Sequence, residues 1–372
     1  MITGVLQEPA FETRVSLLPE AVASLIKKGI TVLVESGAGV KASAGDEDYV
    51  KAGAQVKTRS EIIQSSGILL SIHAPAPSET AGFSSKVLIG VYQPLFSPAL
   101  MKEWAAAKIT SFSLDMLPRT TRAQSMDVLS SQANIAGYKA VLYAANIFPR
   151  YFPMLMTAAG SIAPAKVLIL GAGVAGLQAI ATARRMGAVV EVFDTRPAVK
   201  EEVMSLGAKF VEVEGAADAS KAGGYAVEQT AEFMAKQQAK IAESVAKADI
   251  VITTAQIQGK KAPVLLTTAM VESMRKGSVI IDLAAATGGN TEQTKDNETV
   301  HYKGVTIVGN SALPSTMPSD ASKLYGKNVL NFLQLITDKD AKLHLNWEDD
   351  LVKGCNITHA GEVINDRVKA LL

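Results

Sequence analysis

The sequence predicts an α/β fold with two Rossmann-like, doubly wound domains that have parallel sheets and are linked by long helices. Strand-like and helix-like segments alternate along most of the chain, which is the pattern of a parallel sheet covered by helices. A glycine-rich turn follows an apolar strand near residue 170 and opens a helix. The chain has 372 residues, more than one ordinary domain. Two α/β domains account for all three observations.

Five short β-rich runs predict the strands of the first domain. They are ITGVLQE from Ile2, TVLVES from Thr31, GILLSI from Gly67, KVLIGVY from Lys86 and KITSFSLDM from Lys108. Between the first two runs, LPEAVASLIKKG has helical spacing and a closing glycine.

The second half of the chain repeats this alternation and predicts a set of six strands. The strands are expected in KVLIL, VVEVFDT, KFVEVE, DIVITTA, SVIIDLAAA and VTIVGN. Helices are expected after the glycine turn, near 199–206, from about 226 to 247, and from about 319 to 336.

The domain boundaries follow from this element order. Residues 1–130 and 315–372 should form the N-terminal Rossmann-like domain, which the C-terminal segment completes, and residues 131–314 the second domain. The helix at 319–336 should return the chain to the first domain, where the tail 337–372 adds a small hairpin region.

Composition excludes several classes of protein. Lys and Arg total 37 against 36 Asp and Glu, so charge gives no case for nucleic-acid binding. No window approaches the roughly 18 apolar residues of a membrane span, so no direct membrane insertion is expected. The single cysteine, Cys355, rules out an internal disulfide framework and is expected to be inert.

LILGAGVAGLQA contains Gly171, Gly173 and Gly176 in the G-x-G-x-x-G spacing of a dinucleotide-binding turn. The first glycine allows the tight turn, the second lets backbone approach a pyrophosphate, and the third permits close helix packing. The phosphates would lie at the helix N-terminus, beside Val174 and Ala175.

An acidic residue follows at the end of the next strand. Asp194 lies 23 positions after Gly171, close to the roughly 20 expected for a carboxylate that binds the adenosine ribose hydroxyls. Such a carboxylate repels a 2′-phosphate, so NAD(H) is preferred over NADP(H). Arg196 could instead hold that phosphate, and Thr195 between them is a further candidate contact.

Polar residues crowd the segment RTTRAQSMDVLSSQANIAGYKAV, from Arg119 to Val141. On an α-helix, spacings of three and four would place Gln124, Asp127, Ser131, Asn134 and Tyr138 on one face. Met126, Leu129, Ala133, Ala136 and Ala140 would form a buried face. The polar face should meet a ligand at a cleft between the domains, or form a buried seam between them.

Some catalytic signatures are missing. The chain has no G-x-S-x-G or G-x-x-x-x-G-K motif, and His73, His301, His344 and His359 have no partner at metal-ligand spacing. No histidine or lysine stands out as the base that an alcohol or amine dehydrogenase needs. GGYAVEQ offers a mobile loop in which Tyr225 could cover a cofactor.

The chain resembles the NAD(H)-binding component (domain I, or the soluble α subunit) of proton-translocating NAD(P)⁺ transhydrogenase, within the alanine dehydrogenase/transhydrogenase family. The resemblance rests on PRTTRAQSMDVLSSQANIAGYKA, FDTRPAVKEEV, GGYA and GSVIIDLAAATGGN, and it extends from Glu12, Arg14 and Val15 almost to the end. The R-A-Q-S-M-D segment is highly specific, whereas the glycine spacing alone is not. Gln256, Gln258 and Thr291 depart from the family pattern.

The resemblance implies a homodimer that binds NAD(H) and passes hydride directly to NADP⁺. NADP(H) would be held by a separate domain of the partner, whose membrane subunit couples the reaction to proton translocation (the Si-specific/Re-specific type). The chain would then be cytoplasmic and peripheral at the inner membrane. Arg119, Gln124 and Asp127 would line the nicotinamide site with Ser130, and the turn TTAQIQGKKAP would bring Ala255 to the cofactor.

Two other functions remain open. Alanine dehydrogenase shares the architecture, but it needs a lysine that is absent from LSIHAP and a histidine one strand later that is absent from GVYQPL. A non-catalytic NAD-binding regulator would keep Gly171, Gly173, Gly176 and Asp194 without needing Gln124.

Overall fold

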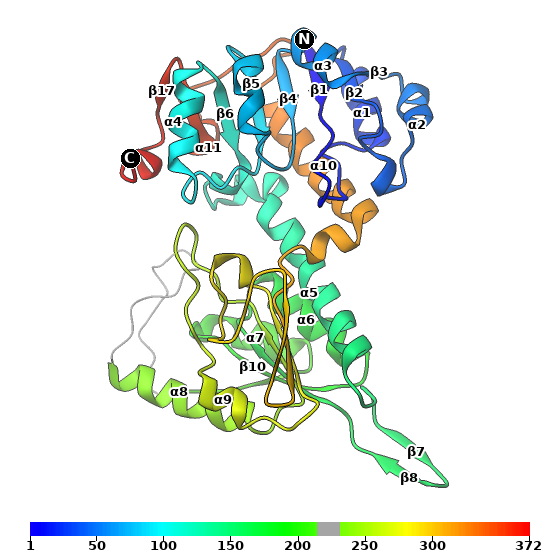
Figure 1. Ribbon diagram of the computed structural model, residues 1–372, viewed down its shortest axis with the longest axis vertical. Coiled ribbons are helices and arrows are strands. Elements are labelled where there is room, and N and C mark those ends of the chain that lie inside the picture. Colours follow the sequence, from blue (N-terminus) through cyan, green and yellow to red (C-terminus); the bar gives the residue numbers. More distant parts are fainter. Residues whose placement is uncertain (214–230) are drawn as a thin grey trace. The chain divides into compact units, whose positions relative to one another are not determined.

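The computed structural model describes residues 1–213 and 231–372. Residue contacts divide the chain into two compact units (Figure 1). Unit 1 comprises Met1–Gln132 and Ser315–Leu372, and unit 2 comprises Ala133–Pro314. Helix α5, Val128–Ile147, contributes its first turn to unit 1 and the remainder to unit 2.

Unit 1 is built on one sheet of eight strands in the order β17-β16-β6-β5-β4-β1-β2-β3. Its first six strands are all parallel to their neighbours and follow the 3-2-1-4-5-6 order of a doubly wound fold. Strands β16 and β17 come from the C-terminal segment and extend the sheet, with β16 antiparallel to β6 and β17 antiparallel to β16. The strands are β1 Ile2–Val5, β2 Thr31–Glu35, β3 Gln55–Lys57, β4 Ile68–Leu70, β5 Val87–Gly90, β6 Thr110–Ser113, β16 Asn356–His359 and β17 Glu362–Val363.

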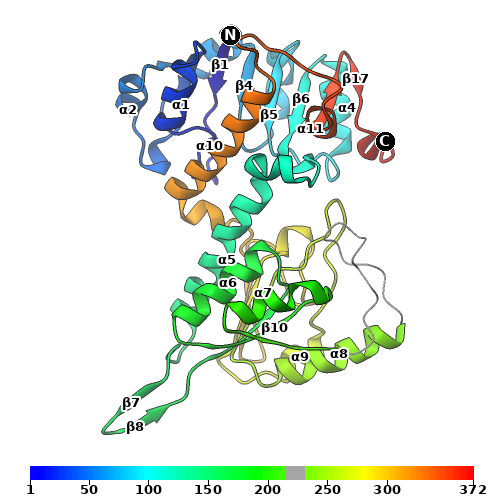
Figure 2. The same cartoon turned by 180° about the vertical axis from the view of Figure 1, so that it is seen from behind.

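Helices cover both faces of this sheet. Helices α1 and α10 lie side by side in front of the strands in Figure 2. Local signals set several starts: α1 has proline at its first position, and Thr58 and Glu61 form a capping box at α3. The helices are α1 Pro19–Ile26, α2 Asp46–Lys51, α3 Arg59–Ser65, α4 Pro98–Ala106, α10 Pro318–Leu335, α11 Asp350–Cys355 and α12 Asp366–Lys369.

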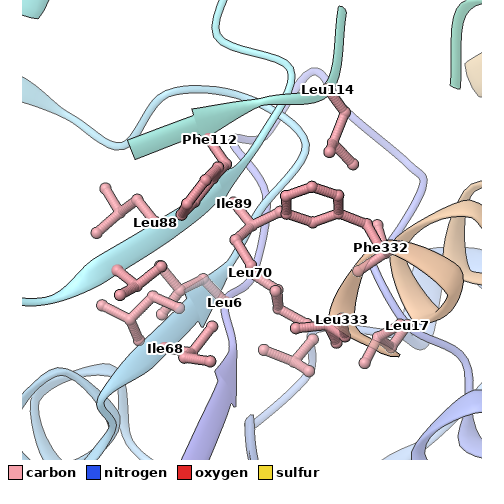
Figure 3. Close-up of a cluster of buried hydrophobic side chains, with 14 of the residues drawn as sticks. Leu6, Leu17, Ile68, Leu70, Leu88, Ile89, Phe112, Leu114, Phe332 and Leu333 are labelled. Carbon is pink, nitrogen blue, oxygen red and sulfur yellow. The ribbon is translucent and has the colours of Figure 1, made fainter. Parts of the chain in front are cut away.

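One part of the core of unit 1 lies between the sheet and α10, and α3 and α4 contribute Ile62, Met101 and Trp104 to the same core. Figure 3 shows strand residues such as Leu70 and Ile89 facing Phe332 and Leu333 of α10. The rings of Phe112 and Phe332 are 5.3 Å apart between centroids. Each such buried side chain contributes roughly 1.5–3 kcal/mol to the free energy of unfolding, which fixes the C-terminal segment to the first part of the chain.

Unit 2 has the same strand order as unit 1. Its seven-stranded sheet runs β11-β10-β9-β12-β13-β15-β14, and its parallel strands again follow 3-2-1-4-5-6. The predicted fold class, two doubly wound α/β domains, is therefore confirmed. The strands are β9 Lys166–Leu170, β10 Val189–Phe193, β11 Lys209–Phe210, β12 Ile250–Thr253, β13 Val279–Asp282, β14 Thr299–Tyr302 and β15 Val305–Val308.

Strand β9 feeds two cores because its side chains alternate between the sheet faces. Val167 and Ile169 join the core under α6, whereas Leu168 and Leu170 join the core under α8 and α9. Helices α6 and α7 lie in front of the sheet in Figure 2, and α8 and α9 in front of it in Figure 1. The helices are α6 Val174–Arg185, α7 Lys200–Ser205, α8 Ala231–Val245 and α9 Thr268–Glu272.

Some predicted elements of unit 2 were wrong or incomplete. The six-strand set lacks β14, an antiparallel edge strand without fully buried residues, so its hydrophobic signal is weak. The strand expected in KFVEVE is limited to Lys209–Phe210. The helix expected from 226 is described from Ala231, because 214–230 lie outside the described residues. Strands β7 Leu155–Thr157 and β8 Gly160–Ile162 form a separate hairpin that the sequence did not reveal.

The predicted polar face from Gln124 to Tyr138 is also wrong, because the α-helix begins only at Val128. Residues Thr121–Met126 form a 3₁₀ helix, η4, and Asp127 has extended backbone with ψ of 91°. Gln124 and Asp127 therefore precede α5 and share no helical face with Tyr138. Leu129, expected to be buried, is 37% exposed.

Among the described helices, none is long and apolar enough to cross a membrane. Cys355 is free and buried, and its thiol donates to the Leu351 carbonyl at 3.0 Å. Burial raises the pKa of this thiol well above its usual value, which fits the expected inert role.

A polar network lies at the carboxyl ends of β1 and β4 in unit 1. Glu12 pairs with Arg14 Nη2 at 2.7 Å and lies 2.7 Å from His73 Nε2. Arg14 Nη1 also donates to Gln132 at 2.8 Å. Although burial alone would raise the pKa of Glu12, hydrogen bonds from Arg14 and His73 hold it well below its usual range.

Glu8 lies in the same network, and its partners there are backbone N–H groups. Its carboxyl accepts the backbone N–H groups of Ile72 at 2.5 Å and His73 at 3.1 Å. Burial raises the pKa of Glu8 from 4.5 to about 7, against the opposing effect of those two hydrogen bonds. Folding therefore favours the protonated form of this side chain.

Stability should consequently fall as pH rises from about 4.5 to about 7 through the titration of Glu8. A shift of this size is worth about 3 kcal/mol, since one pKa unit is about 1.4 kcal/mol. Glu12 is ionised in both states above a pH of about 5.5 and adds nothing to this slope.

Glu8→Gln should flatten the dependence of the unfolding temperature on pH between about 5.5 and 7.5, even if it lowers the temperature overall. The exposed Glu103→Gln should keep the wild-type slope, and an unchanged slope in Glu8→Gln would exclude Glu8 as its cause.

Candidate functional site: a dinucleotide-binding turn and a capped polar loop

The three glycines of the turn between β9 and α6 have different structural roles. Gly171 has φ of +106°, and a Cβ there would lie 2.3 Å from Thr254 Oγ1. A Cβ on Gly176 would lie 1.9 Å from the Gly171 carbonyl oxygen, so this glycine lets α6 pack against the turn. A Cβ on Gly173 would meet no atom of residues 1–213 and 231–372 within 4 Å. The space beside Gly173 is therefore open to a ligand.

The first turn of α6 presents backbone donors beside this open space. Gly173 is the N-cap residue, and the helical ladder begins with the Leu177 N–H donating to its carbonyl at 2.8 Å. The N–H groups of Val174, Ala175 and Gly176 therefore have no helical acceptor. Such a helix start favours anions, including the pyrophosphate of a dinucleotide. The residues present fit that group.

Asp194 is held against the turn. It follows β10, which pairs in parallel with β9, and its Oδ2 accepts the Ala172 N–H at 2.7 Å. Arg196 donates to both carboxylate oxygens, with Nε to Oδ1 at 2.9 Å and Nη2 to Oδ2 at 2.8 Å. The hydrogen bonds to Asp194 raise the pKa of Arg196. Thr195, between them, is partly buried.

The loop after β12 is organised by Asn290. Its side chain donates to the carbonyls of Ala255 at 2.9 Å and Pro263 at 2.8 Å, and accepts the Ala255 N–H at 3.0 Å. Both backbone groups of Ala255 are thus bonded within the protein, and what remains for a cofactor is the second acceptor position of the carbonyl and the methyl group. Asn290 is itself placed by Asp282, a fully buried carboxylate that accepts its N–H at 2.7 Å.

Gly137 of α5, like Asn290, is a position of the site that the sequence did not predict. A Cβ there would lie 2.1 Å from the carbonyl oxygen of Ala175. Helix α5 therefore crosses the first turn of α6 in close backbone contact and helps to fix the donors of that turn. The only sequence signal was a glycine inside a helical pattern, which is too common in helices to indicate a particular contact.

In unit 1, Asp127 and Ser130 are joined. Asp127 Oδ1 accepts the Ser130 N–H at 2.9 Å, and Oδ2 accepts the Ser130 hydroxyl at 2.5 Å. Asp127 is thereby the N-cap of α5. This cap explains why the α-helix starts at Val128 and not earlier. The same two hydrogen bonds fix the side chains of Asp127 and Ser130, which are two of the predicted nicotinamide contacts, relative to one another.

Arg119 and Gln124 lie before this cap and are exposed. Gln124 belongs to η4, and its carboxamide has no hydrogen-bond partner within the described parts of the chain. The 3₁₀ helix itself is anchored, because Asn328 and Asn331 of α10 donate to the Ser125 carbonyl at 2.9 and 2.8 Å. A fixed backbone with a free amide side chain suits a residue that meets a ligand.

Two further predictions concern the loop tyrosine and metal binding. Tyr225 and its glycines lie in 214–230, outside the described residues. No group of three metal-ligating side chains occurs in the described ranges 1–213 and 231–372. Gln256, where the sequence departs from the family pattern, donates to the Leu283 carbonyl at 2.6 Å.

Two doubly wound units, one with a glycine turn beside a strand-end aspartate, define a dinucleotide-binding protein of the α/β class. The family models "Alanine dehydrogenase/PNT, N-terminal domain" and "Alanine dehydrogenase/PNT, C-terminal domain" match residues 4–136 and 140–366. The chain belongs to the alanine dehydrogenase/PNT family.

Within this family the chain is similar to transhydrogenase α subunits. It is 44% identical over 358 residues to NAD(P) transhydrogenase subunit alpha of Cereibacter sphaeroides, covering 95% of this chain and 68% of that protein. It is 43% identical over 356 residues to the α subunit of Haemophilus influenzae, covering 95% of this chain and 69% of that protein. The expected resemblance is confirmed.

Solved structures agree with this placement. A crystal structure of transhydrogenase from Sinorhizobium meliloti has a TM-score of 0.86 at 41% identity, covering 98% of this chain and 99% of that one. An L-alanine dehydrogenase has a TM-score of 0.82 at 25% identity, covering 100% and 99%. The architecture is thus shared with alanine dehydrogenase, whereas the sequence lies nearer to transhydrogenase.

Proposed function

We propose that the chain binds NAD(H) and exchanges hydride directly with NADP(H) held by a partner domain, as the NAD(H)-binding component of a proton-translocating transhydrogenase. Within the family, the observation that favours this function over that of an alanine dehydrogenase is the hydrogen bonding of Arg14 within the protein. Its guanidinium donates to Glu12 through Nε and Nη2 and to Gln132 through Nη1. Three of its five N–H groups are thus used within the protein and its charge is balanced by Glu12, which makes it a weak anchor for an amino-acid carboxylate, and His73 is paired with Glu12.

Unit 2 supplies the binding of the adenosine and pyrophosphate parts. The first-turn N–H groups of α6 receive the pyrophosphate, with Gly173 leaving room for it. Asp194 accepts hydrogen bonds from the ribose hydroxyls. Thr195, Arg196 and Ala255 border this part of the cofactor.

Unit 1 orients the reacting part. Bound NADH supplies the hydride from its nicotinamide ring. Asp127 and Ser130 hold the ring at the start of α5, Arg119 fixes the carboxamide or a neighbouring carboxylate, and Gln124 reaches toward the partner's nucleotide. No side chain has to accept a proton, because hydride transfer between two nicotinamides releases none from O–H or N–H. The residues would act by holding the two nicotinamides in a near-attack arrangement and excluding water.

The partner supplies the other half of the reaction. NADP(H) is held by its separate domain, and its membrane subunit couples transfer to proton translocation. The chain itself is then cytoplasmic and peripheral at the inner membrane.

The β7–β8 hairpin supports the proposed homodimer. It is a separate two-stranded sheet on which Met156 is 75% exposed, and Met154 and Tyr151 just before β7 are 62% and 53% exposed. An isolated hairpin of two strands is marginally stable in water, and exposed apolar side chains of this kind indicate a protein contact. A second copy of the chain would cover both hairpins by symmetry.

Met156→Glu should therefore weaken the dimer by at least about a hundredfold, because each copy loses a buried methionine worth roughly 1.5–3 kcal/mol. Sedimentation equilibrium measures the effect. Met204→Glu introduces the same charge at a 55% exposed methionine of α7 and should leave the dimer intact. A monomeric wild-type chain, or an unchanged dimer in Met156→Glu, would contradict the role of the hairpin.

The function is tested by mixing the chain with NADH and an NADP⁺ analogue, with and without an NADP(H)-binding transhydrogenase domain. Parallel samples contain NADH, pyruvate and ammonia. The proposal requires turnover only with the partner domain. Oxidation of NADH by pyruvate and ammonia without a partner would show an alanine dehydrogenase, and NADH binding without either reaction would show a regulator.

A further inference from the structure

The carboxylate of Asp194 is already filled by donors from the protein. Oδ1 accepts the backbone N–H of Arg196 at 2.8 Å and its Nε at 2.9 Å. Oδ2 accepts the Ala172 N–H at 2.7 Å and Arg196 Nη2 at 2.8 Å. A carboxylate has about four acceptor positions, so ribose hydroxyls find none free.

The four donors differ in how easily they can move away from the carboxylate of Asp194. Those of Ala172 and the Arg196 backbone are fixed by the turn between β9 and α6 and by the chain after β10. The two guanidinium donors belong to a side chain that is 24% exposed, while that of Asp194 is only 6% exposed. Rotation of the guanidinium is the change that frees acceptor positions on Asp194 without moving the backbone of the turn. Two ribose hydroxyls can then replace two guanidinium N–H groups.

We propose that Arg196 competes with the ribose for Asp194, and that this competition sets how strongly the site prefers NAD(H) over NADP(H). This inference rests on the proposed binding of NAD(H). While Arg196 stays paired, its charge cancels that of Asp194, and a 2′-phosphate meets no net repulsion. A phosphate would moreover attract the guanidinium, because arginine binds phosphate through two parallel donors. Arg196 thus weakens NADH binding and tolerates NADPH.

The test is equilibrium binding of NADH and of NADPH to the full chain, followed by nucleotide fluorescence. Arg196→Ala frees Asp194, and Arg196→Lys keeps the charge but loses the planar fork. Arg185→Ala is the matched control. It removes one exposed arginine from the last turn of α6, about 17 Å along the helix from the glycine turn.

Arg196→Ala should bind NADH at least about threefold more tightly and NADPH about tenfold more weakly, because an unpaired carboxylate binds the diol and repels the phosphate. Arg196→Lys should bind NADH more tightly than the wild type while keeping most NADPH binding. Arg185→Ala should change neither the two affinities nor their ratio by more than about twofold, because a surface charge at this distance is screened by salt.

Weaker NADH binding by Arg196→Ala, or an unchanged ratio of the two dissociation constants, would overturn the inference. A wild-type chain that binds no NADH at all would instead refute the proposed function. The two failures are therefore distinguishable in the same titrations.

Discussion

Replacing Gln124 with leucine should slow hydride transfer to a partner-bound NADP⁺ analogue about a hundredfold, the loss typical of a misplaced reacting group. NADH affinity should change less than about twofold, because the proposed affinity determinants are in unit 2. The backbone of η4 is held by Asn328 and Asn331 through the Ser125 carbonyl, so the change removes an exposed amide without disturbing the fold. Single-turnover transfer rates and NADH titrations separate the two effects.

The matched control is Gln55→Leu, the same chemical change at an exposed position of edge strand β3. It should leave both transfer and binding unchanged. If Gln124→Leu transferred hydride at the wild-type rate, Gln124 would have no place in the reaction, and the regulator hypothesis would gain support.

Asp194→Ala should lower NADH affinity about tenfold to a hundredfold. It removes the acceptor of two charge-assisted hydrogen bonds from the ribose, each worth about 1.5–3 kcal/mol. The loss is smaller than their sum, because NADH no longer has to displace Arg196 from Asp194. NADPH should be affected less, or bound more tightly, since the freed guanidinium can meet the 2′-phosphate. The preference between the nucleotides should therefore shift toward NADPH. Titrations with each nucleotide measure this shift directly.

Asp296→Ala, at an exposed acid of the same unit, controls for the general loss of one negative charge. Its two dissociation constants should equal those of the wild type. Equal losses of NADH and NADPH affinity in Asp194→Ala would show that Asp194 only supports the turn through its bond to Ala172.

The parts of the fold that could be predicted are those with local signals. The order of strands and helices follows from runs of β-branched residues and helical spacing, and the glycine turn from the conformation that Gly171 must adopt and the contact that Gly176 must allow. The doubly wound arrangement then follows, because parallel strands need helical crossovers of one hand.

The parts that could not be predicted depend on contacts between distant residues. Periodicity placed Gln124 and Asp127 on α5, but Asp127 caps the helix instead, and the cap shows itself only in its bond to Ser130. The role of Asn290 at Ala255 spans 35 positions of sequence. Arg196 was seen as a possible phosphate ligand, yet its pairing with Asp194 depends on side-chain geometry that spacing does not give.

Direct transfer between two nicotinamides is the central claim, and an isotope label tests it most directly. The chain would be mixed with NADH carrying deuterium at the transferred position, the NADP(H)-binding partner domain and NADP⁺ in ordinary water. We expect one deuterium in each NADPH formed, and no labelled NADPH when either protein is left out. Unlabelled NADPH in the complete mixture would show that the hydrogen passes through an exchangeable group, and direct transfer on this chain would be refuted.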